Sequence, residues 1–198
     1  MRVLILGGAG MLGHKLWQAC SNRFDTWATV RSSYQAYAKY NLFDLFDPQR
    51  LVGGVDAFDF DTVVQALAMV RPNVVINCIG TIKQLPTAND HIMSLTINSI
   101  FSHRLANLCQ AAGARLIHFS TDCDFSGRKW MCTEDDITDA KNLYGRCKFL
   151  GEVSWPGWLT LRTSIIAREL QTASGLVEWF LSNREGHIHH HKTSPRTT

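Results

Sequence analysis

The sequence predicts an α/β fold, a doubly wound parallel sheet with helices on both faces. Short apolar runs of strand length alternate along the chain with amphipathic segments of helix length, which is typical of such sheets. The runs at residues 2–6 and 74–76 are apolar without interruption or nearly so, as in strands buried on both faces. A glycine cluster directly after the first run marks the turn into the first helix.

The elements follow one another in a regular order. We expect strands at residues 2–6, 26–30, 74–76, 116–119 and 158–161, and helices at residues 11–20, 61–70, 92–112 and 142–153. Asp61 is the expected N-cap of its helix, Pro72 follows the end of that helix, and Gly113 closes the long one. Residues 32–54 are less regular, and residues 121–141 are predicted to form a polar loop.

Length, charge and hydropathy restrict the class of protein. The chain has 198 residues, which is enough for one ordinary domain with a sizeable core. The formal net charge is +3 and the basic residues are scattered, so we expect no nucleic-acid partner. The longest apolar stretches are strand-sized and the N-terminus runs straight into a strand, so we expect no membrane-spanning helix and no signal peptide.

Cysteine spacing argues against a metal site. None of the six cysteines forms a C-x-x-C pair, the spacing typical of structural zinc. Several lie in apolar segments, so we expect reduced thiols and a cytoplasmic location. The stretch with His187 and three further histidines at 189–191 has the residue type that binds metals, but its polar, unpatterned surroundings favour a disordered tail. We therefore expect no metal.

The stretch GGAGMLG places four glycines in the turn after the first strand. Two registers fit a dinucleotide-binding loop: G-x-G-x-x-G from Gly8 and G-x-x-G-x-x-G from Gly7, both ending at Gly13. In either register the glycines allow a sharp turn, a close approach to a pyrophosphate and tight packing of the helix, whose N-terminus faces the anion. A triphosphate-binding loop is excluded because His14 stands where lysine is required. A glycine-rich turn without a ligand is the alternative.

The end of the second strand bears on which dinucleotide is bound. Arg31 lies 18 positions after Gly13, where a chain that binds NAD usually has an acidic residue for the ribose 2′-hydroxyl. An arginine pairs instead with a 2′-phosphate, which favours NADP(H) over NAD(H). A solvated surface arginine is the alternative. Asp59 is a further candidate, either bordering the adenine or serving as an acid at a helix start.

The stretch LYGRCK places Tyr144 and Lys148 four residues apart on one face of a predicted helix. A cation beside a phenol lowers the phenol's pKa and lets it act in acid–base catalysis near neutral pH. This spacing also occurs by chance, so an ordinary surface helix is the alternative. Ser120 and Thr121 follow a strand expected near the centre of the sheet, where doubly wound folds bind ligands. Either hydroxyl is placed to hydrogen-bond a substrate carbonyl.

The ordered stretches GGAGMLG, RPNVVINCIG, STDCDFSG, TEDDITDAKNLYGRCKFLGE and LTLRTSII resemble an extended short-chain dehydrogenase/reductase of the dTDP-4-dehydrorhamnose reductase family. The resemblance covers residues 1 to about 166 and implies a Rossmann fold. It implies a catalytic set of Thr121, Tyr144, Lys148 and Asn98. It also implies a cofactor-binding set of Gly7, Gly10, Met11, Leu12, Gly13, Asn77, Cys78, Ile79, Gly80, Tyr144 and Lys148.

The same resemblance implies the chemistry. NADPH would deliver a hydride to a keto carbon of a sugar attached to a nucleoside diphosphate, and the protein would orient and polarise that carbon. Thr121 would fix the carbonyl, and Tyr144 would give its oxygen a proton. Lys148 would hold the ribose and lower the pKa of the tyrosine. Asn98 matches a helix asparagine that organises a proton-relay water, although its segment also fits an ordinary core helix.

The chain departs from the family in two places. Asp124 stands where the family has a branched apolar residue, and a buried unpaired carboxylate is costly. Relatives also continue well beyond this length. We therefore expect a dinucleotide-binding domain at residues 1–166 and the start of a truncated substrate-binding region at residues 167–198.

Two other functions remain open. One is a non-catalytic dinucleotide-binding regulatory subunit, and the other is a nucleotide-sugar epimerase or dehydratase of the same superfamily. The three catalytic side chains favour an enzyme, whereas the short substrate region favours a binding protein. Members of the superfamily often dimerise through such helices, so the resemblance implies a homodimer formed through helices 92–112 and 142–153.

Overall fold

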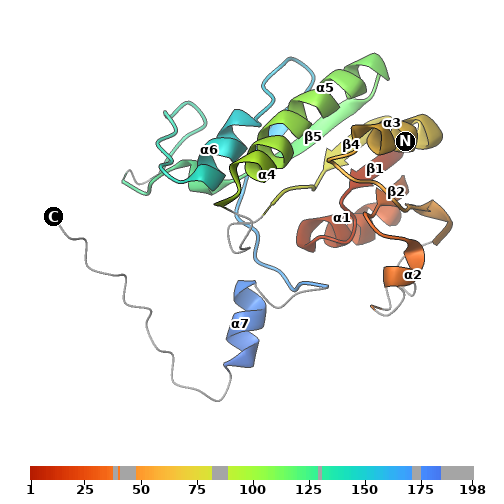
Figure 1. The fold of residues 1–198 in the computed structure, drawn as a ribbon, viewed down its shortest axis with the longest axis horizontal. Helices are drawn as coiled ribbons and strands as arrows, with labels where there is room; N and C mark the ends of the chain where they lie inside the picture. Colours follow the sequence, from red (N-terminus) through yellow and green to blue (C-terminus); the bar gives the residue numbers. More distant parts are fainter. Residues whose placement is uncertain (38–39, 41–47, 82–88, 129–130, 171–174, 184–198) are drawn as a thin grey trace.

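The structure, a computed structural model, describes residues 1–37, 40, 48–81, 89–128, 131–170 and 175–183 (Figure 1). Its six strands form one parallel sheet in the order β3-β2-β1-β4-β5-β6. The strands are β1 (Arg2–Leu6), β2 (Asp25–Thr29), β3 (Leu51–Val52), β4 (Val74–Asn77), β5 (Arg115–Ser120) and β6 (Leu159–Arg162). The chain runs outward from β1 to β3 and then outward from β4 to β6, so the strand order reverses between β1 and β4. Ligands bind at such a reversal in doubly wound folds.

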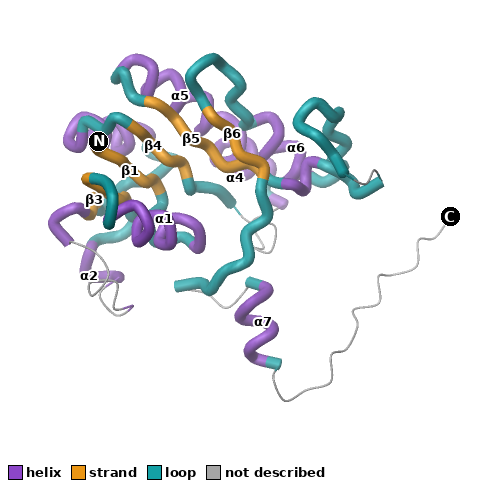
Figure 2. The backbone as a smooth tube through the Cα atoms, turned by 180° about the vertical axis from the view of Figure 1, so that it is seen from behind, coloured by secondary structure: helices purple, strands orange, loops and turns teal. Residues whose placement is uncertain are grey.

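Helices cover both faces of the sheet, which confirms the predicted fold class. The helices are α1 (Met11–Ser21), α2 (Tyr34–Tyr37), α3 (Phe60–Val70), α4 (His91–Leu95), the π-helix η5 (Thr96–Ile100), α5 (Phe101–Ala111), α6 (Leu143–Leu150) and α7 (Leu176–Ser182). Two 3₁₀ turns are η3 (Pro48–Arg50) and η6 (Asp122–Asp124). Helices α3 to α6 lie on one face, and Figure 2 shows α1 on the other.

Strand β1 shows how the sequence fills both layers. Leu4 and Leu6 belong to the core cluster with α3 and α5, whereas Val3 and Ile5 pack with Trp17 of α1. All five side chains are at most 2% exposed. A strand whose successive side chains are all buried must lie inside the sheet, and this fixes the position of the glycine turn that follows β1.

Most expected strand bounds are correct to within one residue, but three of the expected helices differ from the structure in ways that matter for the site. Helix α3 begins at Phe60 with Asp59 as its N-cap residue, so Asp61 lies in the first turn instead of capping it. Helix α6 ends at Leu150 with Gly151 as its C-cap residue, and a Cβ at Gly151 would lie 2.0 Å from the Asn98 carbonyl oxygen, so this position needs glycine. The predicted helix 92–112 is interrupted by the π-turn η5.

The less regular region at 32–54 contains the short elements α2, η3 and β3. The predicted histidine-rich tail lies outside the described residues. Within the part of the chain that the structure describes, no helix has both the length and the apolar character needed to cross a membrane.

Candidate functional site

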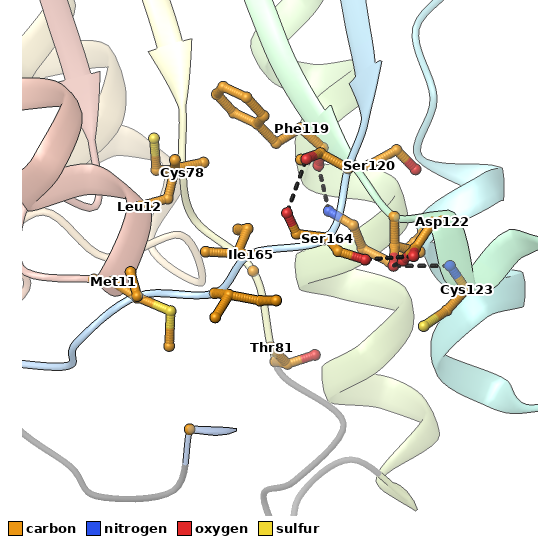
Figure 3. A pocket seen from close by; sticks show the side chains of 18 of the residues that line it. Met11, Leu12, Cys78, Thr81, Phe119, Ser120, Asp122, Cys123, Ser164 and Ile165 are labelled. Atoms are coloured by element: carbon orange, nitrogen blue, oxygen red, sulfur yellow. Dashed lines mark hydrogen bonds between the residues drawn. The ribbon is translucent and has the colours of Figure 1, made fainter. Parts of the chain in front are cut away.

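Two cavities adjoin at the edge of the sheet where the strands end. The larger has a volume of about 510 Å³ and is bounded by the ends of β4 and β5 and by α6 (Figure 3). The smaller, about 450 Å³, lies at the end of β2. Gly10 and residues 78–81, hereafter the 78–81 segment, line both cavities. The two cavities therefore form one crevice at the point where the strand order reverses.

The glycine turn supplies one wall of this crevice. Gly7 has a φ of +81°, which favours glycine, and a Cβ there would lie 3.1 Å from Ile79 Cγ1. A Cβ at Gly13 would lie only 2.1 Å from the Gly7 carbonyl oxygen, so the first turn of α1 needs glycine in order to pack on the loop. Gly8 instead packs against Ala28 of β2. These contacts favour the wider register, which starts at Gly7.

The predicted loop residues divide between the two cavities. Gly7 lines the smaller cavity, whereas Met11 and Leu12 line the larger one. Gly13 lines neither, because its place is in the packing of the helix on the turn.

The smaller cavity contains Arg31, which is exposed at the end of β2. Asp56 and Phe58 also line it, but Asp59 lines neither cavity. Asp59 takes the N-cap position of α3 instead, where its backbone oxygen accepts hydrogen bonds from the amide and the hydroxyl of Thr62. The acid beside the smaller cavity is therefore Asp56, which was not predicted. Its signal in the sequence is its place in the same acidic stretch, DAFDFD.

The larger cavity brings Thr121, Tyr144 and Lys148 together. Thr121 follows β5 directly, and its hydroxyl oxygen accepts a hydrogen bond from the Cys123 amide at 3.1 Å. Asn142 caps α6 by accepting from the Gly145 amide at 2.8 Å. This cap starts the helix just before Tyr144 and places Lys148 one turn later on the same side.

The electrostatics of this triad differ from the expectation in one respect. Burial raises the pKa of Tyr144 above its usual value, although a hydrogen bond with Thr121 acts in the opposite direction. Lys148 is 6% exposed, and its Nζ donates to the Phe119 carbonyl oxygen at 2.6 Å. Burial lowers the pKa of Lys148 to about 8. The pKa of Tyr144 is therefore raised and not lowered as expected, and Lys148 is not among the main causes of its shift.

Asn98 lies behind the crevice and not in it. The side chain is 1% exposed and lines neither cavity. Its Oδ1 accepts from the Thr81 amide at 3.0 Å, and its Nδ2 donates to Thr81 Oγ1 at 2.6 Å. A Cβ at Gly80 would lie 3.3 Å from Asn98 Oδ1 and 3.9 Å from Lys148 Nζ. Asn98 thus holds the 78–81 segment, and its role with a relay water stays a prediction.

The carboxylate of Asp124 is buried, but it has partners. Its Oδ2 accepts from Ser120 Oγ at 3.3 Å and lies 3.7 Å from Nε of Arg162. Arg162 in turn makes two 2.7 Å hydrogen bonds with Glu152. The contacts with Ser120 and Arg162 therefore partly offset the free-energy cost of burying this carboxylate. Burial and a hydrogen bond with Glu152 raise the pKa of Asp124 to about 7.

Comparisons with known proteins agree with this geometry. The profile of the family described as RmlD substrate binding domain matches residues 1–183. The chain belongs to this family. A methionine adenosyltransferase 2 subunit beta from Danio rerio is 29% identical over 176 residues, which cover 86% of this chain and 49% of that protein. The chain thus spans about half the length of this curated relative.

Two solved structures named as dTDP-4-dehydrorhamnose reductases are also similar. One, described as hypothetical, comes from Sulfolobus tokodaii. It is 28% identical with a TM-score of 0.71, and the match covers 85% of this chain and 57% of the Sulfolobus chain. The other comes from Bacillus anthracis and is in complex with NADP. It is 25% identical with a TM-score of 0.58, and the match covers 76% of this chain and 47% of the Bacillus chain. A nicotinamide dinucleotide is thus the cofactor bound within the family.

Some lining residues in this family member were not predicted. Asp122 and Ser164 line the larger cavity, and the Ser164 hydroxyl donates to the Asp122 carboxylate (Figure 3). Their signal in the sequence is their position two residues after the ends of β5 and β6. In the described part of the chain, no three His, Cys, Asp or Glu side chains are grouped so as to hold a metal ion.

Proposed function

We propose that this chain binds NADP(H) and reduces a keto carbon of a sugar linked to a nucleoside diphosphate. The observation that carries the proposal is the continuous crevice: Thr121, Tyr144 and Lys148 line one half, and Arg31 lines the other. Gly10 and the 78–81 segment join the two halves. Membership in a family with an NADP-bound reductase structure supports the same assignment.

The residues present fit a dinucleotide. A pyrophosphate needs backbone without side chains, and Gly7 and Gly10 leave the turn bare beside the start of α1. The cationic Arg31 suits a ribose 2′-phosphate and is the basis for preferring NADP(H) to NAD(H). Lys148 lies near Gly80 in the larger cavity, where its amine could donate a hydrogen bond to a ribose hydroxyl.

The chemistry assigned to the side chains follows from these positions. Bound in the crevice, the dinucleotide would supply the hydride. Thr121 and Tyr144 line the same cavity, and Thr121 is close enough to affect the pKa of Tyr144, so both hydroxyls are available to polarise a carbonyl oxygen there. The raised pKa of Tyr144 keeps its proton in place at neutral pH, as a general acid requires. Lys148 remains a cation below about pH 8 and would favour the phenolate formed after proton transfer.

The test compares Tyr144→Phe with the wild-type chain. NADPH binding is followed by its fluorescence, and NADPH oxidation is followed with a nucleoside-diphosphate keto sugar, dTDP-4-dehydrorhamnose first. We expect both proteins to bind NADPH with similar dissociation constants and only the wild type to oxidise it. Equal turnover in both proteins would refute the role of Tyr144, and a wild type that binds no NADPH would refute the proposed function as a whole.

A second candidate is a dinucleotide-binding regulatory subunit. It is favoured by the curated Danio rerio relative, whose name makes it the beta subunit of a methionine adenosyltransferase. The same experiment separates the two functions. NADPH binding without turnover on any keto-sugar nucleotide would favour the regulatory subunit, because binding alone has no need of Tyr144.

A homodimer forms part of the proposal. Several apolar side chains on α4, η5 and α6 are exposed: Ile92 (77%), Ile100 (51%), Phe149 (42%) and Leu150 (56%). These helices contact one another, so the four side chains are carried by neighbouring elements. Exposed apolar patches of this kind mark protein interfaces, and a second copy of the chain is the partner proposed here.

A further inference from the structure

Asn77 and His118 are partners across the centre of the sheet. Asn77 ends β4, His118 lies in β5, and the two are paired in the register of these strands. Their side chains are 1% and 2% exposed. Asn77 Nδ2 lies 3.0 Å from His118 Nδ1, and Asn77 Oδ1 accepts the backbone N–H of Ile79 at 3.0 Å. The three residues therefore form a chain of contacts that leads from β5 into the crevice wall.

This arrangement determines the tautomer of the histidine. The side-chain oxygen of Asn77 faces the Ile79 N–H, so the amide group that faces His118 is the NH₂ donor. Nδ1 must then accept, and the ring proton lies on Nε2. Burial lowers the pKa of His118 to about 3, and charge interactions with Lys148 and His103 act in the same direction. The ring is therefore neutral at neutral pH.

Ile79 lies in the segment that lines both cavities. Asn98 holds the far end of this segment through Thr81, whose own hydroxyl orients the Asn98 amide. The near end is held by Asn77, whose amide is oriented by His118. If the Asn77 amide rotated, its NH₂ would face the Ile79 N–H, donor against donor, and the near end would be released.

We propose that His118 is a positioning residue for the dinucleotide crevice. As a neutral acceptor it orients Asn77, and Asn77 fixes the 78–81 segment against which the dinucleotide lies. His118 Nε2 is buried and has no hydrogen-bond partner among the described residues, which is unfavourable. If the side chain served packing alone, an apolar residue would fill the site without an unpaired donor. What histidine adds is the Nδ1 acceptor, which contacts Asn77. The identity of the ligand rests on the proposed function, but the contacts do not.

Two variants of nearly equal shape test this role. His118→Asn keeps an acceptor close to the position of Nδ1, whereas His118→Leu has a similar branched outline without one. Val70→Ala, a buried substitution in α3, is the control for a general loss of stability. Hydrogen exchange of the Ile79 amide is measured in the free protein, relative to amides of β1. We expect exchange to be about tenfold faster in the Leu variant, within about threefold of wild type in the Asn variant, and unchanged in the control.

The NADPH dissociation constant is measured in the same proteins. It should rise about tenfold for the Leu variant and be largely restored in the Asn variant. Equal Ile79 exchange in the two variants would overturn the proposal, as would an unchanged NADPH dissociation constant in the Leu variant. Nitrogen NMR of the wild-type ring gives a test without any variant, because a proton on Nδ1 would also overturn it. If the wild type binds no NADPH, the proposed function fails, while the exchange and NMR results still decide what His118 does.

Discussion

The Asp124 carboxylate lies 3.7 Å from Nε of Arg162 in the protein interior, and its side chain is 0% exposed. Burial raises the pKa of this carboxyl to about 7 from an ordinary value of 3.8, and the hydrogen bond with Glu152 acts in the same direction. The folded chain therefore holds a proton on Asp124 at pH values where the unfolded chain has lost it. Stability should decrease as the pH rises from about 4 to about 7 and be level above that range.

Asp124→Asn removes this titration and keeps the shape of the side chain. The free energy of unfolding of the wild type, taken relative to that of the Asn variant, should fall by roughly 2 to 3 kcal/mol between about pH 5 and pH 8. Urea denaturation at several pH values above about 5 measures the difference and avoids the range in which Glu152, whose pKa is lowered, titrates in the unfolded chain. Parallel stability curves for the two proteins would contradict the account.

Lys148 gives the crevice an alkaline limit. Burial lowers its pKa to about 8, so the side chain loses its charge as the pH rises through that value. Affinity for the anionic NADPH should then decrease above about pH 8. The Lys148→Met variant should bind NADPH weakly at every pH, without this decrease. Fluorescence titration at a series of pH values measures it. Lys141→Met, at an exposed position before α6, should behave as the wild type does.

Arg31 should decide between the two dinucleotides. Removing a charged partner of the 2′-phosphate in Arg31→Ala should weaken NADPH binding by about ten- to a hundredfold and leave NADH binding nearly unchanged. Arg23→Ala, at an exposed position just before β2, is the matched control. Tighter binding of NADH than of NADPH by the wild type would remove the reason for assigning Arg31 this role.

The apolar patch on α4, η5 and α6 should hold two copies together. Phe149→Glu places a charge in this patch, so a wild-type dimer should become a monomer at equal concentration. Met69→Glu is the control, because Met69 is 67% exposed on α3, outside the patch. Light scattering coupled to size-exclusion chromatography reports the mass. A monomeric wild type at high concentration would rule out the dimer.

The sequence predicted what local patterns determine. The glycine turn after β1 and the spacing of Tyr144 and Lys148 on α6 follow from the strand and helix patterns around them. What the sequence did not show depends on contacts between distant segments. The π-turn at Asn98 lies against Gly151, the Asp124 carboxylate is paired by Arg162 from β6, and Asn77 is oriented by His118 from β5. A pattern within one stretch of sequence does not reveal which distant stretch it contacts.

The most direct measurement of the central claim, that the two cavities are halves of one dinucleotide crevice, is an NADPH titration of wild type and Gly10→Val. Gly10 lines both cavities and has a φ of −74°, which any residue can adopt. A Cβ there would lie 3.3 Å from the Gly7 carbonyl oxygen and, its chain neighbours aside, within 4 Å of no other atom of the described residues, so valine adds bulk at the crevice wall at the cost of one tight contact. We predict that the wild type binds NADPH and that the variant folds but binds it at least about tenfold more weakly. Equal affinity in the two proteins would contradict the account.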